Sequence, residues 1–469
     1  MDWNTLLCED RIRSQVRRAG SSDLRTEFEK DYHRIIGSAS FRRLQDKTQV
    51  FPLDRSDFIR TRLTHSLEVS SFAKSLGQNI SESIRKVVKD ETFTAEHKAA
   101  VCDILQCAGL IHDIGNPPFG HFGETAIQDW FKKNLSLIHY ENRPVTGILS
   151  EQMLQDFYHF EGNTQALRVV TKLHFLVDEH GMNLTKGLLG TIIKYPVSSL
   201  EINKKSGNIK DKKMGFFYGD RDTFEDIQNA VGTHGSRHPL TYILEAADDI
   251  AYLTADIEDA VKKGCISYEQ LVRELKTYHA AEQNDKYRTV TGWLEERYEK
   301  AVSKGNNRPD LYAVQNWVVS VQGQAIAGAT GAFTEHYREI MEGTYKKALL
   351  ESADVRLLME ALGDIAYRYA FISKPILKLE IAAETIFNFL LEKFVDAVLY
   401  YDTDKTLTAV QAKLVSLISD NYKKIYQIYS AGKPEEEKLY LRLLLVTDYI
   451  CGMTDSYAKS LYQELNGIT

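Results

Sequence analysis

The chain has 469 residues, of which 43% are apolar and 26% charged, and its net charge is −7 from 58 basic and 65 acidic side chains. These proportions are ordinary for a globular protein, and the acidic balance argues against bulk electrostatic attraction to nucleic acid or membrane. The length exceeds what one core usually holds, so we expect one large domain with an appended lobe, or two domains.

Cysteine usage and the absence of long apolar runs indicate the compartment. The sequence contains no CxxC pair, and its five cysteines are scattered: Cys8, Cys102, Cys107, Cys265 and Cys451. That pattern argues against a disulfide framework or a thiolate zinc site and fits a reducing cytoplasm. The first residues lack the apolar core of a signal peptide, and no run of about 18 apolar residues predicts a transmembrane helix. We therefore expect a cytoplasmic protein with no membrane contact.

The first part of the chain predicts an arm followed by helices. Residues 1–29 are polar and charged and predict a solvated N-terminal arm. Apolar spacing predicts a helix over 30–51, before Pro52. Arg42, Arg43 and Lys47 make this segment basic, which usually marks a solvated face. Further helices are predicted over 61–88, 95–113, 121–135, 159–177 and, after a loop, within 139–151.

The segment 194–223 breaks the helical pattern. Pro, Gly and Asn cluster there, with five lysines between 204 and 213. This composition predicts an excursion, about 195–223, with a β-hairpin at 206–208. A helix returns over 238–264, and helices continue from 266 through a polar linker at 303–310. The predicted fold class is all-α, with a helical core domain over 30–265 and a helical C-terminal region over 266–469.

The stretch 105–130, LQCAGLIHDIGNPPFGHFGETAIQDW, concentrates side chains that bind metals or move protons. His112 and Asp113 end an apolar run, where an imidazole and a carboxylate are costly to bury unless they are paired or hold a metal. Both are good ligands for Mg, Mn, Fe or Zn. Adjacent helical residues do not share a face, so the pair can serve one metal only near a helix end. The turn 115–118, Gly-Asn-Pro-Pro, supplies such an end.

His121 and Glu124 open the next helix with i, i+3 spacing, so they share one face. Glu124 could hold the His121 ring in one tautomer and raise its basicity, as expected of an oriented general acid or base. The alternative is a surface hydrogen bond in the first turn of a helix. His65 and Asp248, each in an amphipathic or apolar helix, could complete a metal site, although either residue alone is more often structural.

The combination His … His-Asp … Asp resembles the HD-domain superfamily of metal-dependent phosphohydrolases. The surrounding segments are similar to the deoxyguanosine triphosphate triphosphohydrolase family and occur in family order from about residue 30 to residue 460. They are FRRLQDKTQVF, RTRLTHSLEV, GLIHDIGNPPFGHFGE, HFEGNTQALR, EAADDIAY and DYICGMTDSYA.

This resemblance implies an HD core within 30–265 and a divalent metal ion, with Mg, Mn and Fe left open. The implied metal ligands are His65, His112, Asp113 and Asp248. His121, oriented by Glu124, is the implied catalytic acid/base. The implied reaction converts a deoxynucleoside triphosphate, dGTP by the family name, to deoxynucleoside and inorganic triphosphate.

The resemblance also implies contacts to the two ends of the substrate. Gln49 lies where the family places a contact to the deoxyribose end. Arg62 lies three residues before His65, would share its helix face and could neutralise a phosphate. Lys194 is a second phosphate candidate.

Three further positions match the pattern for the sugar and the pocket wall. Tyr252 and Asp256 lie one and two helical turns beyond Asp248, so one face would present all three. Tyr252 could exclude a 2′-OH, and Asp256 could bind the 3′-OH. Asn163 could line the pocket. The alternatives are core packing for Tyr252 and a helix N-cap for Asn163.

Two other functions stay open at this point. The metal site could serve a different HD phosphohydrolase acting on a nucleoside monophosphate, a cyclic dinucleotide or an alarmone. The chain could also be a non-catalytic nucleotide sensor or a single-strand nucleic-acid binder, which the lysine-rich 204–213 stretch favours. The resemblance further implies a homo-oligomer, with tetramer and hexamer both open.

Overall fold

The computed structural model describes residues 1–13, 23–49, 60–175, 177–281, 284–372 and 374–468. Within these ranges helices dominate, and the only sheet is a two-stranded antiparallel hairpin. The predicted all-α fold class with a small hairpin is therefore confirmed.

The elements up to residue 192 are α-helices, short 3₁₀ and π segments and the two strands of the hairpin. They are α1 (Trp3–Leu6), α2 (Glu27–Ile36), α3 (Ala39–Arg42), η1 (Arg43–Asp46), α4 (Arg62–Ser83), η2 (Ile84–Val88), α5 (Ala95–Ile111), α6 (His121–Asn134), β1 (His139–Tyr140), β2 (Arg143–Pro144), η3 (Val145–Gly147), α7 (Glu151–Tyr158), α8 (Gly162–Arg168), η4 (Val169–Leu173) and α9 (Lys186–Ile192).

The remaining elements are almost entirely helical. They are η5 (Ile209–Asp211), η6 (Tyr218–Asp220), α10 (Arg221–Val231), α11 (Pro239–Lys262), α12 (Tyr268–Ala281), α13 (Asp285–Ser303), α14 (Pro309–Glu335), α15 (Tyr337–Glu342), α16 (Leu349–Ser352), α17 (Arg356–Ala366), η7 (Tyr367–Phe371), α18 (Lys374–Val398), α19 (Ala409–Leu417), α20 (Asp420–Ser430), α21 (Glu435–Cys451) and α22 (Asp455–Leu465).

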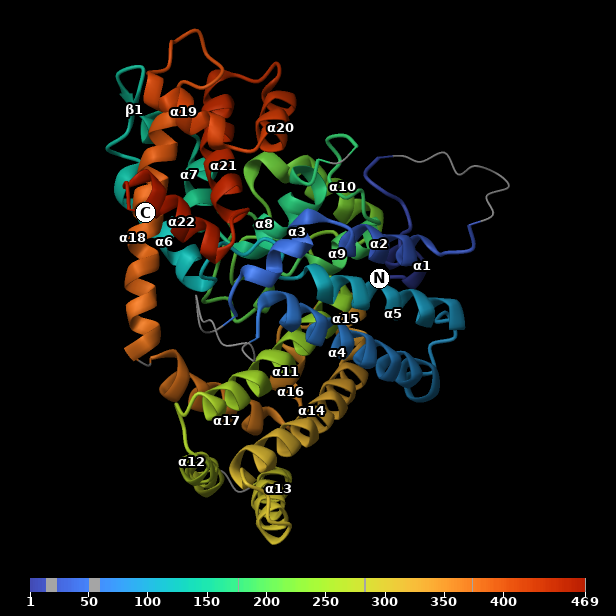
Figure 1. Ribbon diagram of the computed structural model, residues 1–469. Helices are drawn as coiled ribbons and strands as arrows, with labels where there is room; N and C mark the ends of the chain where they lie inside the picture. Colours follow the sequence, from blue (N-terminus) through green and yellow to red (C-terminus); the bar gives the residue numbers. More distant parts are fainter. Residues whose placement is uncertain (14–22, 50–59, 176, 282–283, 373, 469) are drawn as a thin grey trace.

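Three packed helices, α4, α5 and α11, form the centre of the molecule (Figure 1). Helices α12, α13 and α14 lie at one end, α19, α20 and α21 lie at the other, and α18 runs along one side. Helix α11 begins with Pro239 at its first position, where the missing N–H costs nothing, and most of its length is buried. A capping box between Thr61 and Thr64 starts α4. No helix of the described residues is long and apolar enough to cross a membrane.

The hairpin exists, but the prediction that it lies at 206–208 is wrong. It pairs His139 with Pro144 and Tyr140 with Arg143. The two connecting residues, Glu141 and Asn142, have φ of 48° and 64°, as a type I′ hairpin turn requires.

The excursion over 195–223 instead contains turns, the short segments η5 and η6 and, from Arg221, the start of α10. Its apolar side chains Ile209, Met214, Phe216 and Phe217 are buried in the core. Each of these side chains packs into the core separately, so the segments before and after Gly207 do not pair as strands.

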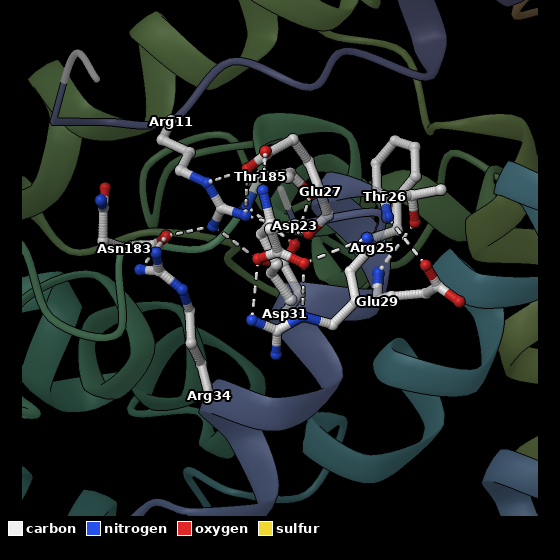
Figure 2. Close-up of polar contacts among 12 residues, drawn as sticks. Arg11, Asp23, Arg25, Thr26, Glu27, Glu29, Asp31, Arg34, Asn183 and Thr185 are labelled. Carbon is white, nitrogen blue, oxygen red and sulfur yellow. Dashed lines mark hydrogen bonds and ion pairs between the residues drawn. The ribbon is translucent and has the colours of Figure 1, made fainter. Parts of the chain in front are cut away.

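The expectation of a solvated arm is wrong for residues 1–13. Trp3 is buried, and its indole N–H donates to the Tyr337 hydroxyl at 2.8 Å. The Arg11 guanidinium is buried between α2 and the chain at Thr185, where it contacts Asp31 at 2.6 Å and Glu27 at 2.9 Å (Figure 2). A buried charge of this kind needs paired carboxylates, and α2 supplies two of them.

The basic helix predicted over 30–51 is broken into α2, α3 and η1, and part of its charge is not solvated. Lys47 is 3% exposed. Its ammonium donates to the carbonyl oxygens of Asn116 at 2.6 Å and Cys451 at 2.7 Å. Burial lowers the pKa of Lys47 to about 8. Residues 50 and 51 of the predicted helix lie outside the described residues.

A buried ionic cluster joins α8 to the C-terminal helix α21. Arg168 donates to Asp448 through Nε at 2.8 Å and Nη2 at 2.7 Å, and its Nη1 lies 3.1 Å from Asp220. Gln165 adds a hydrogen bond to Asp448 at 2.9 Å. This cluster fixes α8, and with it the chain entering from Glu161, against the C-terminal region. The division of the chain at residue 265 stays a prediction.

Replacing Asp448 by alanine is expected to destabilise the fold by about 3–5 kcal/mol, because the buried Arg168 charge would lose its main partner. Denaturant unfolding monitored by circular dichroism measures this loss. Glu436→Ala on the exposed side of the same helix is the matched control and should cost less than about 1 kcal/mol. Equal stabilities of the two variants would contradict the prediction.

Candidate active site

Helices α4 and α5 approach closely enough to bring two histidines together. A Cβ at Gly109 of α5 would lie 2.5 Å from the Ser70 Cα of α4, so only glycine permits this contact. One end of the helix pair carries His65 and His112, whose ring centroids are 5.3 Å apart. Both side chains are buried.

The His112 ring is oriented for ligation by a backbone contact. Its Nδ1 lies 2.8 Å from the Gly109 carbonyl oxygen, which can only accept, so Nδ1 carries the proton and Nε2 keeps a lone pair. That Nε2 is buried without a hydrogen-bond partner among the described residues, as is Nδ1 of His65. A backbone hydrogen bond at one ring nitrogen commonly fixes the tautomer of a metal-binding histidine.

Asp113 follows at the end of α5 and is held by two donors. Arg62 of α4 donates to Oδ2, and the Asn116 amide donates to Oδ1 at 2.8 Å. Burial alone would raise the pKa of Asp113, but the charges of His112 and Arg62 lower it below its usual range. The carboxylate is therefore ionised and in a fixed orientation.

Asp248 approaches from α11. Its Oδ1 lies 3.2 Å from His65 Nε2 and 3.4 Å from His112 Nε2. Lys194 donates to Oδ2 at 3.0 Å. Burial would raise the pKa of Asp248, but Lys194 and His112 hold it well below its usual range. The Lys194 pKa is in turn raised by Asp248, which outweighs its own burial.

The four predicted ligands therefore gather in one place. Ligand atoms of His65, His112 and Asp113 lie within 4.8 Å of one another, and Asp248 contacts both imidazoles. The buried His112 Nε2, which has no hydrogen-bond partner among the described residues and lies beside two ionised carboxylates, fits a divalent metal ion. Two nitrogen and two oxygen donors suit several first-row metals and Mg²⁺.

His121 and Glu124 lie just beyond the turn that follows Asp113. Glu124 is buried, and its Oε2 lies 2.8 Å from His121 Nδ1 while its Oε1 accepts from the Gly162 N–H at 2.7 Å. The His121 side chain is 80% exposed, so Nε2 faces the solvent side of the pair. Glu124 raises the pKa of His121. Burial would raise the pKa of Glu124, but His121 lowers it.

The turn itself depends on a glycine. Gly120 has φ of +60°, and a Cβ there would lie 2.4 Å from Arg62 Nη2. Arg62 thus reaches beneath the start of α6 while contacting Asp113. His65, His112, Asp113 and Asp248 together form the metal-competent group. The Arg62 side chain lies between this group and the His121–Glu124 pair, as the predicted phosphate-binding cation would.

Glutamine at position 124 is expected to lower the pKa of His121, because the largest influence raising that pKa is the Glu124 carboxylate. The imidazolium would lose its proton at a lower pH than in the unmodified chain. A histidine-selective NMR titration, with His121 assigned from His121→Gln, measures the shift. Glu141→Gln, in the exposed hairpin turn, serves as control. A His121 titration unchanged in Glu124→Gln would show that the 2.8 Å contact is not an ion pair in solution.

Comparison with known proteins finds relatives of this chain. A family model described as an HD domain matches residues 62–188. A deoxyguanosinetriphosphate triphosphohydrolase-like protein of Listeria monocytogenes is 49% identical, over all of both chains. A protein of the same description from Synechocystis is 33% identical over all of both chains. A deoxyguanosinetriphosphate triphosphohydrolase of Yersinia enterocolitica is 32% identical over 93% of each.

The chain belongs to the deoxyguanosinetriphosphate triphosphohydrolase family of the HD superfamily. The HD domain is a metal-dependent phosphohydrolase domain, and the segment matched to it contains His65, His112 and Asp113. The fourth predicted ligand, Asp248, comes from outside that segment and reaches the group through α11.

For three of the remaining predicted substrate residues, the structure shows the degree of burial and, for two of them, the direction of a pKa shift. Gln49 is half-buried, and its Oε1 has no hydrogen-bond partner among the described residues. Tyr252 is half-buried, and burial followed by the Asp249 charge raises its pKa. Asp256 is buried, and burial together with Asp259 raises its pKa. The roles of these three in this family member stay predictions.

Asn163 is not the helix N-cap that sequence reasoning left open. Helix α8 begins at Gly162 with Glu161 as its N-cap, and the Asn163 amide donates to Glu161 at 2.6 Å.

Sequence reasoning missed a second buried carboxylate near Glu124. Glu161 is 3% exposed, and its Oε2 lies 2.7 Å from Nζ of Lys213. Burial and the Glu124 charge raise the pKa of Glu161. The only signal was the position of Glu161 in HFEGNTQ. Lys213 was counted with a lysine-rich stretch, not with the site.

Proposed function

We propose that this protein is a metal-dependent hydrolase that converts a deoxynucleoside triphosphate, dGTP in the first instance, to deoxynucleoside and inorganic triphosphate. One observation carries the proposal: a buried metal-competent group adjoins an exposed histidine that a buried glutamate orients. The printed names of the relatives support the choice of substrate.

The reaction breaks the bond between the α-phosphorus and the 5′ oxygen and forms a new bond from water oxygen to that phosphorus. A bound divalent ion would supply Lewis acidity toward the phosphate or the water. His121, with its proton retained by Glu124, donates that proton to the departing 5′ oxygen. Without this transfer the 5′ oxygen would depart as an alkoxide, which is a poor leaving group.

Three cationic side chains are proposed to bind the triphosphate. Arg62 and Lys194 each already contact a carboxylate of the metal-competent group. Both can therefore lie against phosphate oxygens bound at the same place, where charge-assisted hydrogen bonds are strong. Lys213, 39% exposed in its side chain beside Glu161, is a third cation on this side.

Selection of a deoxyribose rests on the face of α11 beyond Asp248. Tyr252 follows after one turn and Asp256 after two, so a sugar beside the metal-competent group would meet them in that order. Tyr252 would leave no room for a 2′-OH, and Asp256 would accept from the 3′-OH. Gln49 and Asn163 complete the proposed contacts to the deoxyribose end and the pocket wall.

Cofactor and assembly belong to the same proposal. The donor set favours Mg, Mn or Fe as the resident ion, and we propose a cytoplasmic homo-oligomer, tetramer or hexamer, from the family resemblance. Single-stranded nucleic acid receives little support as a partner. Three lysines of the 204–213 stretch contact groups of this chain: Lys210 with Gly235, Lys212 with Glu351 and Lys213 with Glu161.

Product identity tests the proposal directly. The purified protein would be incubated with each of the four deoxynucleoside triphosphates, and with GTP, in Mg and then in Mn. Chromatography would resolve nucleosides, nucleotides and inorganic triphosphate. We expect deoxyguanosine and triphosphate from dGTP, with GTP untouched. Monophosphate and pyrophosphate would retain the metal site but overturn the cleaved bond, and the absence of any product would favour a nucleotide sensor.

A further inference from the structure

The turn that carries His121 contains a backbone conformation that must be held in place. Phe119 is not a glycine, yet its φ is +60°, and Gly120 follows with φ +60°. A bulky residue in the left-handed region is strained and persists only where its surroundings fix it. The Phe119 N–H donates to Oδ1 of Asp455 at 2.9 Å. Asp455 lies 336 residues later, at the first position of α22.

The other oxygen of Asp455 holds a second segment of the site. Its Oδ2 accepts from the Thr48 N–H at 3.0 Å and from the Thr48 hydroxyl. Thr48 immediately precedes Gln49, the predicted contact to the deoxyribose end. Thr48 also forms an antiparallel bridge with Thr61, and the Arg62 N–H donates to the Lys47 carbonyl at 2.8 Å. One carboxylate thus lies between the His121 turn and the Gln49 segment.

Lys47 reinforces the same junction. Its ammonium donates to the carbonyl oxygens of Asn116, in the turn, and Cys451, at the end of α21. Asn116 in turn donates to Asp113. The start of α22 therefore contacts the turn directly after the proline pair, through Asp455, and Lys47 joins the end of α21 to the turn before the proline pair.

Asp455 is 1% exposed, so its carboxylate has given up almost all hydration. Such a group costs free energy unless donors replace the lost water. Three donors converge on it, and the two backbone N–H groups among them, those of Thr48 and Phe119, cannot accept. A carboxylate, which only accepts, suits all three, whereas an amide in its place would direct an N–H₂ group at one of them.

We propose that Asp455 is a positioning residue that sets the His121 turn and the Gln49 segment in register with each other. The inference rests on the proposed hydrolase function. It assigns to the far C-terminal helix pair a part in building the active site. Asp455 contacts neither the metal-competent group nor His121 itself, so it would act through Phe119 and Thr48.

Asp455→Asn is the first test, in the full-length protein with its metal. Displacing a catalytic group by about 1 Å can cost about 10²-fold in rate, and we expect kcat to fall by about that factor. Binding of Mn²⁺, measured by calorimetry, should be unchanged because the four ligands are held elsewhere. Ser456→Ala is the matched control, since the side chain of that exposed neighbour donates to Asp46, and it should keep wild-type kcat and KM.

Thr48→Val separates the two halves of the contact and remains informative if Asp455→Asn does not fold. It removes one buried hydrogen bond on the Gln49 side only. We expect KM to rise up to about tenfold while kcat stays near the wild-type value. A purely structural role would lower the melting temperature without this division between KM and kcat. Unchanged KM in Thr48→Val, or unchanged kcat in a folded Asp455→Asn, would overturn the inference.

A readout without turnover distinguishes failure of this inference from failure of the proposed function. Glu124 raises the pKa of His121, whereas the charges of Arg62 and Lys213 lower it. If Asp455→Asn loosens the turn, the NMR titration of His121 should move toward its ordinary pKa, whereas Ser456→Ala should leave it in place. An inactive wild type would refute the hydrolase, and the titration would still decide whether Asp455 positions the turn.

Discussion

Alanine at position 112 is expected to abolish metal-dependent turnover and to weaken metal binding severely. His112 presents to the centre of the group a buried Nε2 that makes no hydrogen bond among the described residues, with its tautomer fixed by the Gly109 carbonyl. Losing a residue that only supports a metal ligand typically costs 10–100-fold, so loss of a ligand should exceed about 100-fold.

Metal content by mass spectrometry and Mn²⁺ affinity by calorimetry would be measured beside the hydrolysis rate. Asp113→Asn is a second variant of similar shape, and it should lose metal as His112→Ala does. His139→Ala, on the exposed hairpin, controls for the loss of an imidazole as such. Treatment of the wild type with a chelator should reproduce the variant, and added Mn²⁺ should restore only the wild type. A His112→Ala protein with full turnover would refute the metal assignment.

Local spacing predicted part of the candidate site, and the family resemblance implied the rest of it. His112 and Asp113 come at the end of an apolar helix, directly before a turn rich in glycine and proline. The His121–Glu124 pair depends only on i, i+3 spacing in one helix. His65 and Asp248 lie far from this stretch in the sequence, and only the family resemblance implied that they join it.

The hairpin was predicted at the wrong place because the sequence contains two turn signals and the stronger one does not form a hairpin. Ser206-Gly207-Asn208 is a stronger turn signal than Glu141-Asn142, yet only the latter is flanked by strands. Buried Met214 and Phe217 tie the chain after Gly207 into the core, and a sequence pattern does not reveal that constraint. Local turn propensity was therefore overridden by tertiary packing.

The buried polar groups escaped prediction for a related reason. Lys47 looked like part of a solvated basic face, but its partners include a carbonyl 404 residues away. Asp455 is likewise explained only by donors from Thr48 and Phe119. A charged residue is expected at the surface unless paired, and the pairing here exists only in the folded chain.

His121→Gln is expected to lower kcat by about 10²- to 10⁴-fold, the usual contribution of a general acid or base, while metal binding stays intact. Glutamine retains a hydrogen bond to Glu124 but carries no proton to give to the 5′ oxygen.

The pH profile adds a second criterion. The acid must be protonated, so activity should fall as pH rises through the raised pKa of His121. His121→Gln should lose that limb altogether, whereas Glu124→Gln should move it to lower pH. If His121→Gln kept both the rate and the limb, another group would be the proton donor, and the exposed imidazole would be only the surface hydrogen bond that its spacing also allows.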